Sequence, residues 1–288
     1  MYRYVNYSDI DKNKWNGAVH YSPNGNVFGY HWYLKAALRE WDAVVEDDYQ
    51  SVMPVLTSPL HHEIYDLIPQ LGPYSVNVLH SRRVKEMVDI ALQHGGGALY
   101  PLNNKITNTH LKDHKISHRP FLSFLLNQPY ELLSSRYDQA LYNTIHGHSK
   151  DHLTFTSGMK PELLVGLTSY PSIKKNALMR IMYNALQRGI GFSNGIKLKE
   201  GDEFLAASFF ISSHNKIFEI FSMPRPDRDA RRLLMDLVIR NGAGKPMSIC
   251  TYEETEVLED LGFVKEFSYQ LDASNPLSKL KKAIRMPY

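Results

Sequence analysis

One order of predicted elements occurs twice along the chain, and this repeat limits the folds that the sequence can adopt. Each copy has a hairpin around an acidic turn, then a third strand, a helix and a short apolar strand. The strands are predicted at residues 43–45, 51–56, 63–69 and 98–102 in the first copy and at residues 196–198, 204–212, 216–223 and 246–251 in the second. The repeat predicts two related α/β domains that each have a mixed sheet.

The length of the chain agrees with two domains. At 288 residues it exceeds what one typical hydrophobic core supports. The pattern is interrupted at Asn127-Gln128-Pro129 and again at His146-Gly147-His148. We therefore expect an N-terminal domain over residues 1–128 and a C-terminal domain over residues 129–288.

Composition excludes several classes of protein. Hydrophobic residues make up 43% and charged residues 22% of the chain, the balance of a globular protein rather than a disordered or fibrous one. The formal net charge of +3 gives no reason to expect DNA binding. The sequence contains one cysteine and no apolar run long enough to span a membrane, which favours a soluble protein of the reducing cytoplasm.

Three helices are predicted from apolar residues that recur at helical spacing. The first begins at Ser81 and ends before Gly95, and the second covers residues 173–188. The third begins near Asp229 and ends at Gly242. Each lies where the repeat requires a helix or directly before the second hairpin.

The second half resembles the C-terminal part of a GNAT acyltransferase domain. The resemblance rests on the strand at residues 216–223, the helix from Asp229, the strand at 247–251 and the ending Leu258-Glu-Asp-Leu-Gly-Phe263. The duplication, the region between Trp15 and Trp41, and the run Ile68-Pro-Gln-Leu-Gly-Pro-Tyr74 resemble the Fem-type aminoacyltransferases. Those proteins are double-GNAT enzymes that transfer amino acids from aminoacyl-tRNA.

The resemblance implies two tandem GNAT-like domains and an acyltransferase. The donor would be an acyl-CoA or an aminoacyl-tRNA, with no tightly bound cofactor, and the acceptor would be a small-molecule or peptide amine. Two features depart from the family pattern, because residues 224–232 contain no glycine for a diphosphate and Leu258 stands where a tyrosine is common. A double-GNAT binding or scaffold protein without catalysis is therefore the alternative.

An arginine cluster at the start of the Asp229 helix is the candidate site for an anionic donor. Guanidinium groups bind phosphate in a bidentate manner, and a helix N-terminus favours negative charge. A solvated first helical turn is the alternative interpretation. The predicted donor-binding residues are Ser222, Met223, Arg225, Arg228, Arg231 and Arg232.

Two residues are candidates for acid and base catalysis. Glu219 is a single carboxylate in the apolar strand at residues 216–223 and could deprotonate the attacking amine; an exposed position or a salt bridge is the alternative. Tyr252 follows the next strand and could supply the acid that Leu258 cannot.

Other reactive residue types point to no further site. Cys250 lies in an apolar strand and is predicted to be a buried, inert thiol. The histidine groups around residues 110–118 and 146–152 lack a metal-binding arrangement, so no metal is expected. Gly95-Gly-Gly97 follows a helix, the reverse of a phosphate loop. The basic tail at residues 273–288 is expected to be a solvated helix.

Overall fold

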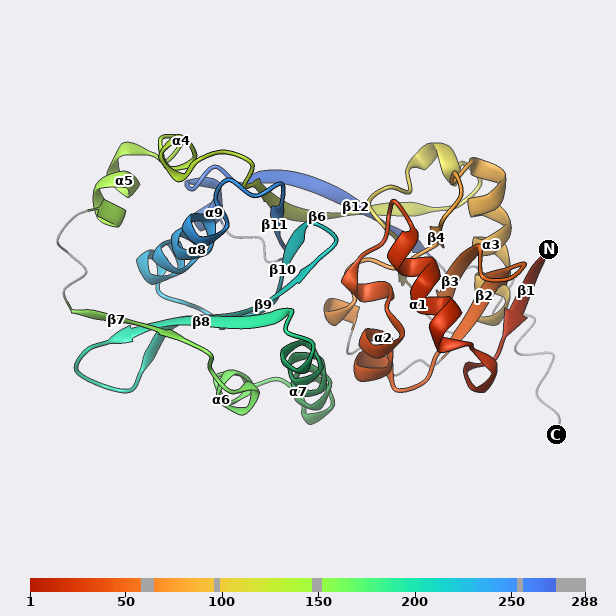
Figure 1. Ribbon diagram of the computed structural model, residues 1–288, viewed down its shortest axis with the longest axis horizontal. Helices are drawn as coiled ribbons and strands as arrows, with labels where there is room; N and C mark the ends of the chain where they lie inside the picture. Colours follow the sequence, from red (N-terminus) through yellow and green to blue (C-terminus); the bar gives the residue numbers. More distant parts are fainter. Residues whose placement is uncertain (58–64, 96–98, 147–151, 253–255, 273–288) are drawn as a thin grey trace. The chain divides into compact units, whose positions relative to one another are not determined.

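The computed structural model describes residues 1–57, 65–95, 99–146, 152–252 and 256–272. The predicted basic tail therefore lies outside the described residues. By their contacts, the residues form two compact units, Met1–Arg119 together with the chain from Phe267 onward, and Pro120–Glu266. Strands form two sheets with helices around them (Figure 1), so the predicted α/β class is confirmed. The predicted boundary between residues 128 and 129 concerns the sequence repeat and stays a prediction.

The first unit is built on a sheet with the strand order β1-β2-β3-β4. Its pairings are all antiparallel, so the mixed sheet predicted for the first copy is wrong for these strands. Its strands are β1 (Tyr2–Val5), β2 (Asp42–Glu46), β3 (Ser51–Val55) and β4 (Tyr74–Ser75). Its helices are α1 (Lys12–Tyr21), α2 (His31–Leu38) and α3 (Ser81–His94), with short 3-10 helices at Tyr7–Asp9, Val27–Gly29 and Asn108–His110. The predicted hairpin of the first copy is the β2–β3 pair. Helix α3 buries the predicted apolar stripe of Val84, Met87, Val88 and Ala91.

The strand predicted at residues 63–69 is wrong where the structure describes it. Residues 65–67 form a 3-10 turn, closed by a bond from the Ile68 N–H to the Tyr65 carbonyl of 3.0 Å. Pairing with β3 begins only at Tyr74. The prolines at 69 and 73 lack the N–H that a strand ladder needs, which explains why pairing starts after them.

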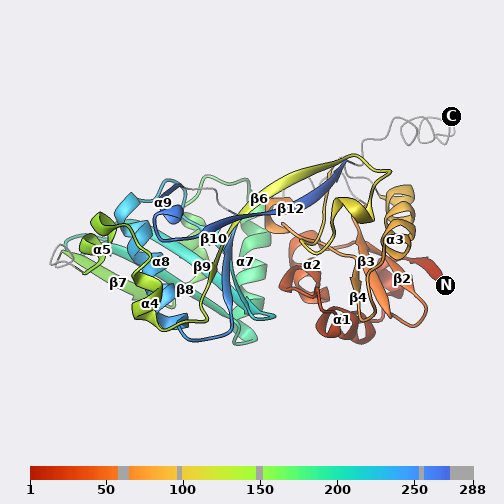
Figure 2. The same cartoon turned by 90° about the horizontal axis from the view of Figure 1, so that it is seen from above.

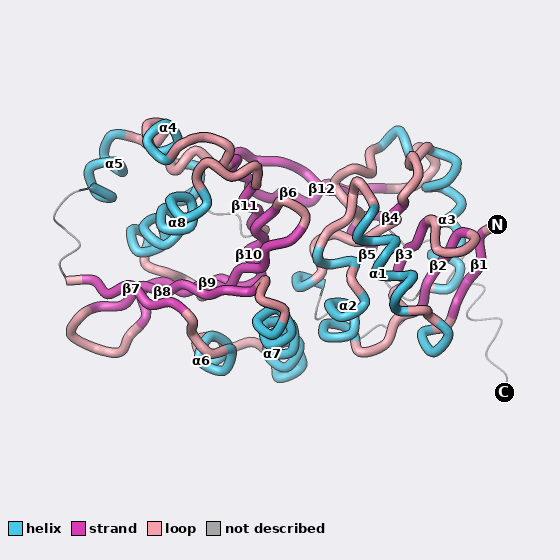
Figure 3. The backbone as a smooth tube through the Cα atoms, viewed as in Figure 1, coloured by secondary structure: helices cyan, strands magenta, loops and turns pink. Residues whose placement is uncertain are grey.

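The second unit contains most of an eight-stranded sheet with the order β5-β12-β6-β11-β10-β9-β8-β7. The strands are β5 (Leu99–Pro101), β6 (Ile116–Leu125), β7 (Leu153–Ser157), β8 (Gly191–Leu198), β9 (Phe204–Ser213), β10 (Lys216–Ser222), β11 (Ser248–Thr251) and β12 (Val264–Asp272). The helices are α4 (Tyr130–Ser134), α5 (Gln139–His146), α6 (Pro161–Gly166), α7 (Ser172–Gln187), α8 (Arg228–Gly242) and α9 (Glu256–Glu259). Helix α8 covers one face of the sheet, and α6 and α7 cover the other (Figure 3).

Strands of the two sequence halves pair with each other. Strand β6 belongs to the first half but pairs with β11 of the second, with Leu125 opposite Ser248. Strand β12 belongs to the second half but pairs with β5 of the first, with Gln270 opposite Pro101. In the sheet β6 and β12 are neighbours (Figure 2). The eight-stranded sheet therefore contains β5 and β6 of the first sequence half together with strands of the second half.

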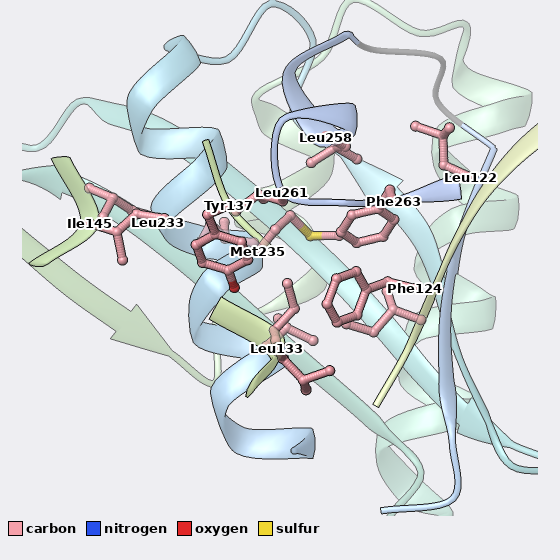
Figure 4. Close-up of a cluster of buried hydrophobic side chains, with 14 of the residues drawn as sticks. Leu122, Phe124, Leu133, Tyr137, Ile145, Leu233, Met235, Leu258, Leu261 and Phe263 are labelled. Atoms are coloured by element: carbon pink, nitrogen blue, oxygen red, sulfur yellow. The ribbon is translucent and has the colours of Figure 1, made fainter. Parts of the chain in front are cut away.

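The core of the second unit lies between the sheet and α8. Leu133 and Tyr137, which come from α4 and the segment after it, meet Met235 of α8 in this core. Leu258 and Phe263 enter it from the chain around α9 (Figure 4). Leu258, predicted from the family resemblance to replace a tyrosine, is fully buried and serves packing here.

An aromatic cluster fills the first unit beside α1 and α2. Trp15 and Trp41 are fully buried, with ring centroids 4.5 Å apart. His31 stacks on Tyr7 at 5.9 Å and lies 5.8 Å from Trp41. Burial, with Lys12 and Lys35 nearby, lowers the pKa of His31 to about 4, so the folded protein holds this ring uncharged at neutral pH.

We expect His31 to make stability fall with acidification between pH 6.5 and about 4. In that window the unfolded chain binds a proton at His31 that the folded chain does not. The contribution of the neutral ring to the free energy of unfolding is therefore fully present above the unfolded pKa and is lost progressively below it. A decrease in the free energy of unfolding of about 2–3 kcal/mol from pH 6.5 to 4.5 follows from about 1.4 kcal/mol per pH unit. Urea unfolding of the wild type across this range measures it.

His31→Phe is the matched control, because it keeps the stacked ring and removes the titrating nitrogens. The free energy of unfolding of the wild type minus that of this variant should decrease as the pH falls, because only the wild type has the titrating ring. A pH-independent difference would show that His31 does not titrate in this window.

Candidate functional site

Strands β10 and β11 pair in parallel at their start and then stop pairing. The registered partners are Lys216 with Ser248, Ile217 with Ile249 and Phe218 with Cys250. Strand β10 continues to Ser222 on β9 alone, with a bulge between Glu219 and Phe221. A bulge redirects backbone groups and often ends pairing beside a functional site. The side of β10 beyond the bulge is therefore available for contacts other than the strand ladder.

Ser222 lies at the end of β10, where pairing with β11 has ended. The next N–H, that of Met223, donates to the Ala207 carbonyl of β9 at 2.8 Å. Backbone groups of successive strand residues point to opposite sides, so the Ser222 N–H faces away from β9. The Ser222 hydroxyl is buried without a hydrogen-bond partner among the residues that the structure describes. The role of Ser222 in donor binding stays a prediction.

Glu219 forms a buried ion pair with Arg231 of α8. Its Oε1 and Oε2 accept from Arg231 Nη1 and Nη2, both at 2.6 Å. The Ser208 hydroxyl of β9 lies 3.0 Å from Arg231 Nη1 and accepts from it. The two charged side chains are 1% and 2% exposed, so both charges are neutralised inside the core. Bidentate geometry of this kind is among the strongest hydrogen bonding in proteins.

This pair changes the interpretation of two predicted site residues. Arg231 was predicted to bind a donor anion, but its guanidinium already binds a carboxylate away from solvent. Glu219 was predicted to act as a base, and both of its oxygens accept from that guanidinium. A salt bridge was the alternative considered for Glu219 from the sequence, and the structure shows one.

Two of the other predicted arginines contact one carboxylate of the chain itself, that of Asp260. Arg232 binds Asp229 at 3.1 Å and also Asp260, and Arg228 lies 3.4 Å from the same Asp260. Arg225 is exposed with a positive φ of 53°. The acids that neutralise this cluster include Asp260, which the sequence analysis missed because it lies far along the chain.

The N-terminus of α8 is occupied by carboxylates of the chain itself. Asp227 caps the helix, and its carboxylate accepts from the Ala230 N–H at 2.9 Å. The loop before it is tied to β9, since the Asp227 N–H donates to the Leu205 carbonyl at 2.8 Å. A second carboxylate, that of Asp229, stands in the first turn. The favourable field of this helix end is thus already used by the protein's own carboxylates.

Tyr252 and Cys250 lie at the end of β11. The Tyr252 ring packs against Phe121 with centroids 5.4 Å apart, and the register places residue 252 level with the β10 bulge. Its role as an acid stays a prediction. Cys250 is buried, and burial raises the pKa of its thiol to about 11, so it stays protonated and weakly reactive at neutral pH.

The histidines serve local structure where they are described. His114 binds Asp89 at 2.9 Å, and His110 contacts the Leu79 carbonyl at 3.1 Å. Within the described ranges, no group of three or more histidine, cysteine or acidic residues is arranged to hold a metal ion. Gly95 ends α3, whereas Gly96, Gly97 and His148 fall outside the described residues.

Comparison with solved structures identifies the fold. The chain is similar to FemX, with a TM-score of 0.63 and 11% identity over 96% of this chain and 99% of that one. It is similar to a tandem GNAT protein from the clavulanic acid biosynthesis pathway (TM-score 0.50, 10% identity, 96% and 99% covered). The structure of L-PGS from Bacillus licheniformis gives a TM-score of 0.53 at 12% identity, with 95% of each chain covered.

The predicted resemblance to double-GNAT and Fem-type proteins is confirmed at the level of the fold. No protein-family model and no curated protein matches the sequence. None of the described helices is both long and apolar enough to cross a bilayer.

We expect single substitutions of the buried pair to be more destabilising than the double substitution. Glu219→Leu or Arg231→Met alone leaves an unpaired buried charge and should lower the free energy of unfolding by about 3–5 kcal/mol. Replacing both should recover most of that loss, because no charge then remains in the core. Denaturant unfolding of the four proteins measures the coupling.

Arg228→Met is the surface control, since its side chain is 62% exposed, and it should change stability by less than about 0.5 kcal/mol. Additive effects of the two buried substitutions would contradict a coupled pair.

Proposed function

We propose that this chain is an acyltransferase that transfers an aminoacyl or related acyl group to an amine. The observation that carries the proposal is the separation of β10 from β11 beside a bulge, with Ser222 at that point. It occurs in a chain that has the fold of FemX and of a tandem GNAT protein along nearly its whole length. The reaction centre is assigned to the end of β10.

The donor is proposed to be an aminoacyl-tRNA rather than an acyl-CoA. The capped and acidic start of α8 argues against a bound diphosphate, as described above. A polyanion has a better surface elsewhere in the second unit. Residues 163–199, which include α7 and β8, contain four lysines, two arginines and no acid. Lys197 of this segment pairs with Asp202 at 3.4 Å, and the other lysine and arginine side chains favour contact with a phosphate backbone.

The proposed chemistry needs little from the protein beyond positioning and polarisation. The amine nitrogen attacks the ester carbonyl carbon, a C–N bond forms, and the C–O bond to the ribose breaks. The Ser222 N–H is assigned to the developing oxyanion. The proton lost by the amine leaves on the ribose oxygen, and Tyr252 is the candidate that delivers it.

Glu219 is assigned a positioning role instead of that of a base. To accept a proton it would have to give up a 2.6 Å bond to Arg231 inside the core, where an unpaired charge is costly. The pair instead joins α8 to β10 directly before the bulge. Holding this part of β10 fixes where the Ser222 N–H points.

A binding or scaffold role without catalysis is the second candidate. It is favoured by the same ion pair, because both oxygens of Glu219, the carboxylate predicted to be the base, accept from Arg231. The two candidates differ in one observable, because a scaffold binds the polyanion and transfers nothing.

We expect aminoacyl-tRNA to bind and acetyl-CoA to leave the melting temperature unchanged. A ligand that binds only the folded state must raise stability by mass action, so about 1 mM acetyl-CoA and CoA should give no shift. Transfer of a labelled amino acid from tRNA to a panel of amines then measures catalysis. A melting-temperature increase with acetyl-CoA would overturn the donor assignment, and binding of tRNA without transfer would favour the scaffold.

The basic surface can be tested separately. Lys174→Ala with Lys175→Ala should weaken tRNA binding and reduce the slope of log K against log salt by up to about 1–2, as expected for lost phosphate contacts. Lys105→Ala with Lys112→Ala removes the same charge from the first unit and should leave the slope unchanged. Equal effects of the two pairs would indicate binding by overall charge alone.

A further inference from the structure

Strand β7 is an open edge of the eight-stranded sheet. It is the last strand in the order and pairs only with β8 (Figure 1). Its register runs from Leu153 opposite Leu198 to Ser157 opposite Asn194. In the described part of the chain no strand lies on its outer side. An unpaired edge presents a row of backbone donors and acceptors to another strand.

The hydrogen bonds of the residues directly before and after β7 show which backbone groups of the strand face outward. The Lys199 N–H donates to the His152 carbonyl at 2.8 Å, and the Gly158 N–H donates to the Ser193 carbonyl at 3.2 Å. Residues 152 and 158 therefore face β8, and so do 154 and 156 by the alternation of an antiparallel ladder. The backbone N–H and C=O groups of Leu153, Phe155 and Ser157 therefore point away from β8, toward the open edge.

This edge lacks the features that usually protect one. Its sequence Leu-Thr-Phe-Thr-Ser contains no charged residue and no proline, the residues that commonly block edge pairing. It also has the β-branched and aromatic residues that favour strands. Phe155, at its centre, is a large apolar side chain that is 44% exposed.

We propose that β7 pairs with β7 of a second copy of this chain, in an antiparallel dimer whose two-fold axis passes beside Phe155. In that register Leu153 lies opposite Ser157 of the second copy, and Phe155 lies opposite its own equivalent. Each outward-facing residue then meets an outward-facing residue, and each such pair exchanges both N–H···O bonds. The self-complementary register is the reason to favour a second copy over another occupant.

Side-chain chemistry agrees with this register. The two Phe155 rings would form a cross-strand aromatic pair, and no like charges would face each other. A five-residue edge is short compared with a standard interface, so the dimer is expected to be weak and concentration dependent.

Sedimentation velocity over about 5–200 µM protein tests the proposal. We expect the mass to rise from 33.1 kDa toward twice that value as concentration increases. Phe155→Lys places two like charges opposite each other and should give a monomer throughout. Leu163→Lys on α6 is the matched control, because Leu163 is 45% exposed but lies off the edge, and it should associate as the wild type does.

Cross-linking gives a second readout that does not depend on mutational disruption. Opposed residues of a hydrogen-bonded pair have Cα atoms about 5.5 Å apart, within disulfide range. The one natural thiol, Cys250, is buried. Phe155→Cys should therefore form a covalent dimer under mild oxidation, and Leu163→Cys should not.

Circular dichroism confirms that each variant is folded. A wild type that stays monomeric at all concentrations, together with no cross-link at residue 155, would overturn the proposal. An extended peptide from another protein at this edge would also leave the chain monomeric, and that outcome counts against a second copy.

Discussion

The buried pair of Glu219 and Arg231 is the interaction on which the second unit depends. Its two side chains are 2% and 1% exposed, so each charge exists in the core only because the other is 2.6 Å away. Ser208 adds a third element, since its hydroxyl on β9 accepts from the same guanidinium. Helix α8 is thereby held in one rotation against β9 and β10, because any other rotation leaves a carboxylate unpaired.

A second buried charge on α8 fixes its opposite face. Asp236 accepts from the hydroxyls of Tyr130 at 2.7 Å and Tyr137 at 3.0 Å, and Arg240 lies 3.1 Å from it. Burial and the bond to Asp236 raise the pKa of Tyr130 to about 12, so that phenol stays a donor. Helix α8 is therefore held by buried charges at two positions, through Arg231 on β10 and through Asp236 on the tyrosines at 130 and 137.

Periodicity and turn chemistry predicted most of the helices and strands, whereas they could not predict which side chains far apart in the sequence form pairs. The helix that begins at Ser81 and the bulged strand from Lys216 follow from local patterns. The position of Arg231 on the buried face was readable, because it lies three residues before Leu234 and seven before Val238 on one helical stripe. Its ion pair was not predicted, since nothing local shows that a carboxylate on β10 will face it. The pairing of β6 with β11 and of β12 with β5 was not predicted either, because the sequence of an apolar strand does not show which strand it will pair with.

That pairing explains why the likeness to double-GNAT proteins covers the whole chain rather than one half. Strand β11 needs β6 from the first half, and β5 needs β12 from the second. A half cut near residue 128 would lose a paired strand and expose an uncovered sheet edge, which favours aggregation. The first half is therefore required even if all chemistry occurs at the end of β10. The eight-stranded sheet is thus built from both sequence halves, so neither half contains all of its strands.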